Sequence, residues 1–497
     1  MRRYDGTGSG EDVANALTVD DSGNVYVTGY STNGINYDFA TIKYSPNGAS
    51  LWVRRYDGPG NGSDQADALV LDSDGNLYVT GWSVVNGGGA DYNTIKYAAN
   101  GDTLWVRRYT GPGNFHEDGA SALAVDASGN VYVTGRSVGS DTSFDYATIK
   151  YNSFGDTLWV RRYTGPGNFF DEASALAVDV SGNVYVTGRS DGTGFFDYDY
   201  ATIKYSSAGD TLWVRRYTGP GNSDDDASAL AVDASGNVYV TGRSVGSDTS
   251  FDYATIKYNS FGDTLWVRRY TGPGNFFDEA SALAVDVSGN VYVTGRSDGT
   301  GFFDYDYATI KYSSAGDTLW VRRYTGPGNS DDDASALAVD ASGNVYVTGR
   351  SVGSDTSFDY ATIKYNSFGD TLWVRRYNGL ENGFDEASAL AVDDSGNVYV
   401  TGESDGTGTF DYDYATIKYV QFACVDTAGD ANGDGKVTLP DIITLVNHIF
   451  KGAPKPDPAC RGDANADGKI TLPDIIVEVN YVFKGGPKPL KSKECCL

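Results

Sequence analysis

Two twelve-residue segments near the C-terminus carry oxygen-bearing side chains at a spacing that could hold metal ions. They read DANGDGKVTLPD over residues 430–441 and DANADGKITLPD over residues 463–474. A hard divalent cation takes about six to eight oxygen ligands, and calcium loops place them at this spacing, with a glycine for the sharp turn. The sequence therefore predicts two calcium ions. The predicted ligands are Asp430, Asn432, Asp434, Lys436 (through its backbone carbonyl), Thr438 and Asp441, and then Asp463, Asn465, Asp467, Lys469, Thr471 and Asp474.

A helix is expected to follow each loop. Thr438 can cap the first helix, Pro440 is tolerated in its first turn, and Asp441 favours its positive end. The helices should end at Gly452 and Gly485, because each glycine is soon followed by a proline. No helical pattern precedes either loop, and the last ligand is aspartate where an ordinary EF-hand has glutamate.

Both departures fit the type I dockerin, which residues 424–490 closely resemble. The resemblance implies binding to a cohesin domain on a scaffold protein, usually in extracellular complexes that attack plant polysaccharide. In that family, partner contacts concentrate just before the end of the loop and along the helix. Here these positions are Leu439, Pro440, Val446, Asn447 and Lys451, repeated as Leu472, Pro473, Val479, Asn480 and Lys484. Because the two halves match at all five positions, the resemblance allows docking in two orientations.

The cysteines of the chain all lie in or beside this segment, at Cys424, Cys460, Cys495 and Cys496. Clustered cysteines in a small module indicate disulfide bonds and an oxidising compartment, and three pairings remain open. A module of this size has little core of its own, so calcium and disulfides would share its stabilisation.

Most of the remaining chain is a repeat. The segment VYVTG, or its variant LYVTG, recurs eight times and places a tyrosine at residues 26, 78, 132, 185, 239, 292, 346 and 399. Residues 164–270 and 271–377 are identical. One unit, residues 173–217, contains four short β-rich segments separated by turns rich in Gly, Asn, Asp and Ser, which predicts a four-stranded antiparallel meander.

Four-stranded sheets repeated at this period are typical of β-propeller blades. The units resemble bacterial β-propeller repeats, whose consensus runs through ALAVD, GNVYVTG, DYATIKY and a following tryptophan. We predict a mainly β protein: an eight-bladed β-propeller over residues 1–422, followed by a small α-helical, calcium-binding, dockerin-like domain over residues 423–497. The N-terminal segment Arg2–Tyr4 should complete the last blade, which otherwise lacks its fourth strand. Tryptophans recur on the fourth strand, where we expect them to pack between blades; only Trp82 lies elsewhere.

No catalytic residue is assigned in the propeller. The same carboxylates recur in blade after blade. Of the two histidines, His116 lies in a variant loop with no partner cysteine or histidine, and His448 lies on the helix after the first calcium loop. Long loops such as residues 135–146 and 188–200 combine aspartate with Phe and Tyr, which is typical of a carbohydrate-binding face. Residues 81–92 of the second unit depart most from the consensus and are the first place to expect a unique site.

The charge balance excludes some partners. Asp and Glu number 66 against 38 Lys and Arg, giving a formal charge of −28, which disfavours nucleic acid and anionic lipid. No apolar run is long enough for a membrane span. Met1 stands where other units have a valine in mid-strand, so we expect the chain to be truncated, with an export signal lost upstream, and the protein to be secreted or at the cell surface.

These observations favour a secreted, non-catalytic scaffold or binding protein, which a calcium-dependent dockerin attaches to a cohesin-bearing extracellular complex and whose propeller has a carbohydrate as candidate ligand. One alternative is a polysaccharide-degrading enzyme, a glycoside hydrolase or lyase, with the propeller as its catalytic domain. A further alternative is a self-assembling surface layer built from the repeated faces.

Overall fold

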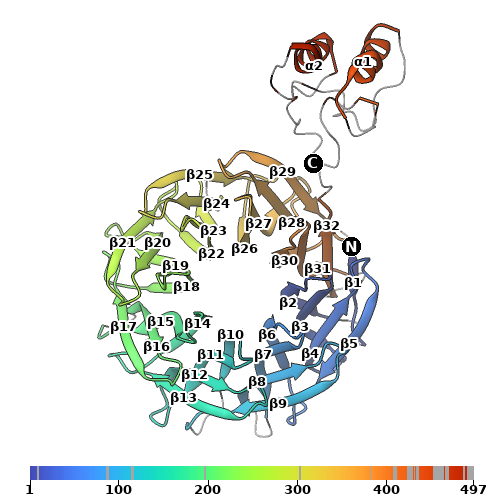
Figure 1. Cartoon of the computed structure of the whole chain (residues 1–497). Coiled ribbons are helices and arrows are strands. Elements are labelled where there is room, and N and C mark those ends of the chain that lie inside the picture. Colours follow the sequence, from blue (N-terminus) through green and yellow to red (C-terminus); the bar gives the residue numbers. More distant parts are fainter. Residues whose placement is uncertain are drawn as a thin grey trace. The chain divides into compact units, whose positions relative to one another are not determined.

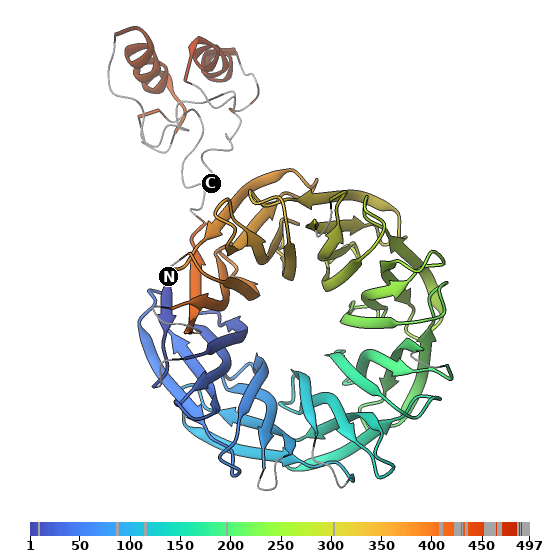
Figure 2. The same ribbon diagram turned by 180° about the vertical axis from the view of Figure 1, so that it is seen from behind.

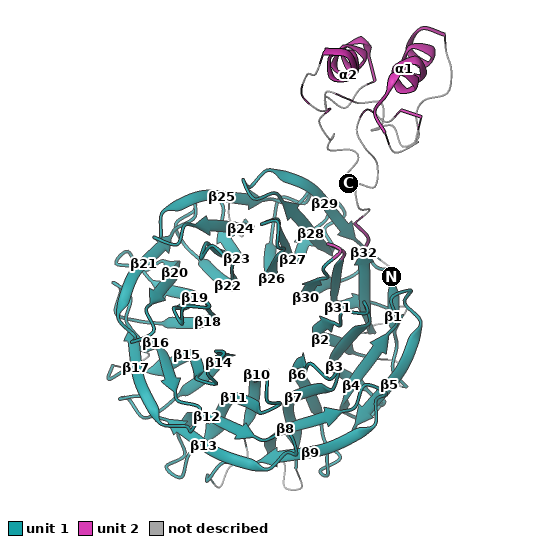
Figure 3. Ribbon diagram, viewed as in Figure 1, with its two compact units in different colours: residues 1–394, 398–418 teal, residues 395–397, 419–497 magenta. Residues whose placement is uncertain are grey.

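The computed structural model divides the chain into two compact units, residues 1–394 with 398–418 and residues 395–397 with 419–497 (Figure 3). The first unit is an eight-bladed β-propeller and the second contains two helices. The described residues are 1–7, 10–85, 89–113, 117–194, 197–301, 304–380, 382–406, 411–421, 429, 431–432, 436–451, 464, 470–484, 487 and 489.

Each blade is a four-stranded sheet. Blades 1 and 2 contain β2 (Asp12–Val19), β3 (Val25–Thr32), β4 (Tyr37–Tyr44), β5 (Ser50–Tyr56), and β6 (Asp64–Leu71), β7 (Leu77–Val84), β8 (Ala90–Tyr97), β9 (Thr103–Tyr109). Blades 3 and 4 contain β10 (Gly119–Val125), β11 (Val131–Val138), β12 (Phe144–Tyr151), β13 (Thr157–Tyr163), and β14 (Asp171–Val178), β15 (Val184–Asp191), β16 (Tyr198–Tyr205), β17 (Thr211–Tyr217). Blades 5 and 6 contain β18 (Asp225–Val232), β19 (Val238–Val245), β20 (Phe251–Tyr258), β21 (Thr264–Tyr270), and β22 (Asp278–Val285), β23 (Val291–Asp298), β24 (Tyr305–Tyr312), β25 (Thr318–Tyr324). Blades 7 and 8 contain β26 (Asp332–Val339), β27 (Val345–Val352), β28 (Phe358–Tyr365), β29 (Thr371–Tyr377), and β30 (Asp385–Val392), β31 (Val398–Asp405), β32 (Tyr412–Tyr419) with β1 (Arg2–Tyr4).

Within a blade the strands pair antiparallel in chain order, as in β14–β15–β16–β17. Tight turns join them. Gly182 adopts a φ of 76°, a left-handed conformation that favours glycine, and the Asp179 carboxylate accepts the N–H of Asn183 at 2.9 Å. The predicted meander is therefore confirmed, together with the reason for its Asp-x-x-Gly-Asn turns.

Hydrophobic cores lie between neighbouring blades. One of them joins Tyr185, Tyr200 and Trp213 of blade 4 to Val238 and Val240 of blade 5. Equivalent clusters recur around the ring. A blade thus buries its apolar face only by packing against the next blade, which is why the repeat needs a closed ring.

A buried tyrosine on the third strand of most blades also bonds to the next blade. Tyr200 of blade 4 donates its hydroxyl to the backbone oxygen of Ala254 in blade 5 at 3.2 Å. Seven junctions share this bond, which is called the tyrosine link here. Its donors and acceptors are Tyr92 and Ala147, Tyr146 and Ala201, Tyr200 and Ala254, Tyr253 and Ala308, Tyr307 and Ala361, Tyr360 and Ala415, and Tyr414 and Ala40.

The fourth-strand tryptophans pack between blades, as predicted. Trp213 is buried against Tyr185 of its own blade and Tyr258 of the next, and its indole N–H donates to the Ser260 backbone oxygen at 3.3 Å. Trp82 lies instead on β7, the second strand of blade 2.

The ring closes through the N-terminal segment, as predicted (Figures 1 and 2). β1 pairs antiparallel with β32, with Arg3 opposite Ala415. The Arg3 guanidinium binds Asp413 at 2.8 Å and the Ser404 hydroxyl at 2.9 Å. The seventh tyrosine link, from Tyr414 of blade 8 to the Ala40 oxygen of blade 1 at 3.1 Å, joins the last blade to the first.

A cavity remains at this seam. It is lined in part by Met1, Tyr44, Tyr399 and Lys418. In other junctions the two equivalent tyrosines sandwich a tryptophan; Trp52, for example, contacts Tyr26 and Tyr97. At this seam no tryptophan lies between Tyr44 and Tyr399 in the described part of the chain, and the cavity takes its place.

Filling this void should stabilise the propeller. We expect replacement of Met1 by Leu-Trp-Val to raise the midpoint of thermal unfolding by about 2–4 °C, because burying an indole contributes about 2 kcal/mol. Replacement by Leu-Ala-Val is the matched control. Differential scanning calorimetry of both proteins checks this, and equal midpoints would show that the seam cavity does not limit stability.

Candidate functional site

The second unit is built around two helices, α1 (Leu439–Lys451) and α2 (Leu472–Lys484). Each begins after a threonine whose backbone N–H donates to a buried aspartate three residues later. The distances are 2.7 Å from Thr438 to Asp441 and 2.8 Å from Thr471 to Asp474. This is the reciprocal half of a capping box, with aspartate in the role of glutamate. It fixes the last predicted calcium ligand of each loop at a helix start.

The first loop folds onto Asp441. Besides Thr438, the Asn432 backbone N–H donates to this carboxylate at 3.1 Å, and Asp441 is fully buried. Predicted ligand positions three, nine and twelve therefore lie close together in the described part of the loop, and their oxygen-bearing side chains are of the kind that calcium binds. Lys436, also described, lies in the same loop.

Several predicted residues lie outside the described part of the chain. They are Asp430, Asp434, Asp463, Asn465, Asp467, Lys469, His116 and the four cysteines. Their roles, including the cysteine pairing, stay predictions.

The helices share a small core that includes the buried residues Ile442, Leu445 and Ile475. Val446 and Val479, two of the predicted partner contacts, are half-buried and pack against this core. Asn447 and Asn480 are also half-buried, whereas Leu439, Pro440, Lys451 and their equivalents Leu472, Pro473, Lys484 are exposed. The predicted contact set is thus split between the core and the surface.

Sequence reasoning missed the most exposed apolar residues of the helices. Phe450 is 63% exposed and its equivalent Phe483 is 61% exposed, while Ile443 and Ile476 are each about half exposed. Together with Leu439 and Leu472 they form what is called here the apolar face of each helix: Leu439, Ile443 and Phe450 on α1, and Leu472, Ile476 and Phe483 on α2. The missed signal was their identical placement in the two halves.

In the propeller, arginines and carboxylates alternate along the first and second strands of successive blades. Arg189 of blade 4 contacts Glu172 of the same blade at 2.9 Å and Asp226 of blade 5 at 3.9 Å. This charge ring recurs from blade 3 to blade 8, with ion-pair distances of 2.9–4.0 Å. It has one gap, because Arg296 of blade 6 pairs with Glu279 but not with Asp333 of blade 7. Its members are Arg136, Glu172, Arg189, Asp226, Arg243, Glu279, Arg296, Asp333, Arg350 and Glu386.

The charge ring is interrupted where the chain closes. In the cross-strand register that pairs Glu172 with Arg189, blade 8 pairs Glu386 with Glu403, blade 1 pairs Val13 with Tyr30, and blade 2 pairs Gln65 with Trp82. Blade 3 resumes the ring with Gly119 opposite Arg136. The non-ring residues form what is called here the exceptional arc: Glu403, Val13, Tyr30, Gln65, Trp82 and Gly119.

Carboxylates and phenols meet at the start of this arc. Glu11 accepts hydrogen bonds from the hydroxyls of Tyr30 at 2.6 Å and Tyr37 at 2.8 Å. Burial and the nearby Glu386 and Glu11 raise the pKa of Glu403 to about 7. Glu403 therefore loses its proton near neutrality and can donate or accept a hydrogen bond there. The sequence signal for Glu403 and Tyr30 was their place in the segments GES and GYS, where most blades read GRS.

Within the described residues, no helix is long and apolar enough to cross a membrane.

Comparisons with known proteins agree with both units. The model of the dockerin type I domain matches residues 428–482. The beta-propeller repeat model, SBBP, matches residues 2–36, 158–196, 212–248, 265–303, 319–355 and 372–408. No curated protein matches the sequence.

Among solved structures, Sqt1 of Chaetomium thermophilum, determined bound to the N-terminus of the ribosomal protein L10, is 11% identical with a TM-score of 0.52, covering 84% of this chain and 98% of that one. The periplasmic gluconolactonase PpgL of Pseudomonas aeruginosa is 14% identical with a TM-score of 0.44, covering 76% and 98%. The β-propeller domain of the Pyrococcus furiosus trilobed protease is 8% identical with a TM-score of 0.42, covering 71% and 94%. At these identities the likeness to Sqt1 concerns the fold alone.

The chain is therefore a protein of SBBP-type beta-propeller repeats with a C-terminal type I dockerin domain.

Proposed function

We propose that this chain is a secreted, non-catalytic binding protein, which its dockerin attaches to a cohesin-bearing extracellular complex. The observation that carries the proposal is the duplicated apolar face in a domain that matches the dockerin model. Contiguous exposed apolar side chains on so small a domain are typical of a protein-binding surface.

Each helix offers the partner the same chemistry. The apolar face of α1 lies beside the exposed Pro440 and ends at Lys451, and α2 repeats this with Pro473 and Lys484. The two faces are equivalent side chain by side chain, so a partner that accepts one also accepts the other. We therefore propose two docking orientations, in which one cohesin binds through the apolar face of either α1 or α2.

Two calcium ions would hold this surface in place. Type I dockerins bind calcium, and here the twelve predicted ligands would supply the oxygens of two sites. A bound ion neutralises the clustered carboxylates and ties each loop to the helix that follows. Asp441 and Asp474 act in both roles, since each is a predicted ligand and accepts the N–H at its helix start.

The propeller would supply the ligand-binding function, and we place it at the exceptional arc. Elsewhere on the charge ring each arginine has at least one carboxylate partner. In the arc the same register carries an indole, a phenol, an amide and the Glu403 carboxyl group. Aromatic faces pack against the C–H faces of sugars while amide and carboxyl groups bond their hydroxyls, so a neutral saccharide is the ligand class that fits.

One observation favours the enzymatic alternative. Glu403, with its pKa raised to about 7, lies near Glu11, which accepts hydrogen bonds from two phenol hydroxyls. Glycoside hydrolysis uses a pair of carboxyl groups, one of them with a raised pKa. A binding protein and a hydrolase thus differ in whether saccharide bound at the arc is cleaved.

Removing calcium should unfold the dockerin and leave the propeller intact. We expect chelation with EDTA to abolish the helical part of the far-UV circular dichroism while the β signal stays, and calcium to restore it. Magnesium in equal amount is the control. Helicity that persists after chelation would contradict the ligand assignment.

Removing one apolar face should leave docking intact. We expect the double variant I443D/F450D, and likewise I476D/F483D, to bind type I cohesins within about twofold of the wild-type affinity, because the other face remains. The fourfold variant should lose at least 100-fold, which corresponds to about 3 kcal/mol. Isothermal titration against a panel of type I cohesin domains measures this. Complete loss in either double variant would refute two-orientation docking.

The arc should control saccharide binding. We expect Trp82→Ala to weaken binding of xylan or β-glucan oligosaccharides at least tenfold, because stacking on the indole is lost. Phe276→Ala removes an aromatic ring that is 68% exposed in a repeated loop and is the matched control.

The same oligosaccharides can be tested for cleavage. Release of reducing ends that disappears in Glu403→Gln would establish the hydrolase instead of the binding protein. Equal weakening by Trp82→Ala and Phe276→Ala would remove the arc from the proposed function.

A further inference from the structure

The junction between blades 1 and 2 differs from the other seven at two buried positions. Phe39 stands where the others have the tyrosine of the tyrosine link, and Asn93 stands where they have the accepting alanine. Both side chains are fully buried. The junction therefore has no tyrosine link, and it carries an amide group that no other junction has.

This exchange leaves buried polar atoms unsatisfied. Neither amide atom of Asn93 makes a hydrogen bond of normal distance and angle, although the side chain faces Tyr56. The same holds for the hydroxyl of the fully buried Ser83, which faces Asp64. In blade 4 the equivalent serine, Ser190, accepts a hydrogen bond from Arg216 at 2.5 Å. Arg108 of blade 2 keeps the equivalent ion pair, with Asp91 at 3.0 Å as Arg216 has with Asp199, but it makes no hydrogen bond to Ser83.

The residue that differs beside Arg108 is Asn93, which lies directly opposite it in the β8–β9 pairing, where other blades have alanine. A buried hydroxyl or amide without a partner costs about 1–3 kcal/mol. Such a cost at one junction of a repeated structure calls for a ligand that recovers it.

Three carboxylates lie next to the unsatisfied hydroxyl. Oxygens of Asp38, Asp57 and Asp64 are within 4.8 Å of one another. Ser83 is the cross-strand partner of Asp64. A Cβ added at Gly58 would stand 1.9 Å from the Ser83 hydroxyl and 2.7 Å from an Asp64 oxygen, so both are directed at the same confined space. Asp38 and Asp64 are buried, and Asp57 is exposed and gives access from solvent.

The third carboxylate is itself a departure from the repeat. Five junctions have a threonine at the position of Asp57; Thr218, for example, donates its hydroxyl to Asp199 at 2.6 Å. Aspartate cannot donate such a bond when ionised, and it adds a negative charge beside Asp38. Arg55 binds Asp38 at 2.9 Å, which leaves one cationic group among three carboxylates.

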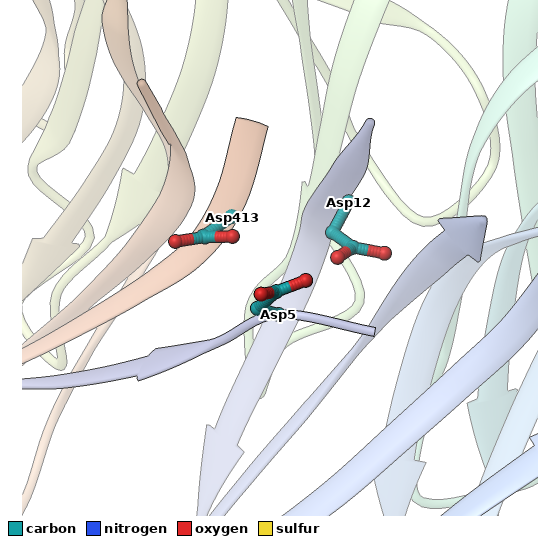
Figure 4. Close-up of side chains that lie close together, drawn as sticks. All are labelled: Asp5, Asp12 and Asp413. Carbon is teal, nitrogen blue, oxygen red and sulfur yellow. The ribbon is translucent and has the colours of Figure 1, made fainter. Parts of the chain in front are cut away.

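The seam between blades 8 and 1 provides an internal comparison. It also has aspartate at the threonine position, and oxygens of Asp5, Asp12 and Asp413 lie as close together (Figure 4). There, however, the serine hydroxyl is satisfied, because Ser31 accepts a hydrogen bond from Arg55 at 2.5 Å. The seam thus has the carboxylates without the free hydroxyl.

We propose that Asp38, Asp57, Asp64 and Ser83 form a calcium site in the propeller, distinct from the two dockerin loops. Calcium prefers oxygen ligands at about 2.3–2.6 Å, so one ion can reach oxygens separated as these are. The ion offsets the surplus negative charge and gives the Ser83 oxygen a partner. Asn93 is a positioning residue, which keeps the competing guanidinium of Arg108 away from Ser83.

The number of calcium ions bound by the full chain tests this site. We expect equilibrium dialysis at saturating calcium to give one ion fewer per chain for Asp57→Thr than for the wild type. Asn93→Ala should also lose one ion, because Arg108 can then reach Ser83 as in the other blades. Both variants restore the residue that most other blades carry, so the fold should persist. Asp5→Thr at the seam is the matched control and should bind as many ions as the wild type.

The stability of the propeller gives a second readout, which calcium binding by the dockerin loops does not affect. Calcium should raise the unfolding midpoint of the β signal in the wild type and in Asp5→Thr, and much less in Asp57→Thr and Asn93→Ala. Equal ion counts for wild type and Asp57→Thr would overturn the proposal. Loss of an ion in Asp5→Thr would overturn it as well, because carboxylates alone would then suffice.

Discussion

The propeller depends on the tyrosine link, the hydrogen bond from a buried tyrosine hydroxyl to a backbone oxygen of the next blade. The donors are removed from water, so the hydroxyl must find its partner inside the protein. Because that partner always belongs to the neighbouring blade, none of blades 2 to 8 satisfies its tyrosine alone. These hydrogen bonds join successive blades from blade 2 onward, and the last one runs from Tyr414 of blade 8 to the Ala40 oxygen of blade 1. Ring closure is therefore what satisfies Tyr414 of the last blade, and the N-terminal strand completes that blade.

The repeated contacts and the candidate sites lie largely in different blades. Blades 3 to 7 repeat one set of contacts, so they present similar surfaces many times. Distinct chemistry appears only where a blade departs from the repeat, and these departures gather in blades 8, 1 and 2. The Glu403, Tyr30 and Trp82 positions break the charge ring, while Phe39 and Asn93 break the tyrosine link. A repeat protein with a long uniform arc thus concentrates its specificity beside the point of closure.

Much of the fold could be predicted from the sequence, because one unit with the same turn and strand pattern recurs eight times. The four strands per unit, the buried tryptophans and the closing role of Arg2–Tyr4 follow from period, turn residues and alternation. The charge ring could not be predicted, since Arg189 and Asp226 are neighbours only across two blades. The same holds for the exceptional arc, which is recognised by register between strands. In the dockerin, the resemblance indicated Val446 as a contact, whereas its packing places it half in the core, and the exposed Phe450 was missed.

Cross-linking the closing strand tests the central claim most directly. Arg2 lies opposite Thr416 in the β1–β32 register, so the pair Arg2→Cys and Thr416→Cys should form a disulfide on mild oxidation, identified by mass spectrometry of the joined peptides. The pair Arg2→Cys and Ile417→Cys, shifted by one residue to the other face of the strand, should not. A link in the first pair alone is the result expected of a ring closed in this register. No link in the first pair, or equal links in both, would contradict it.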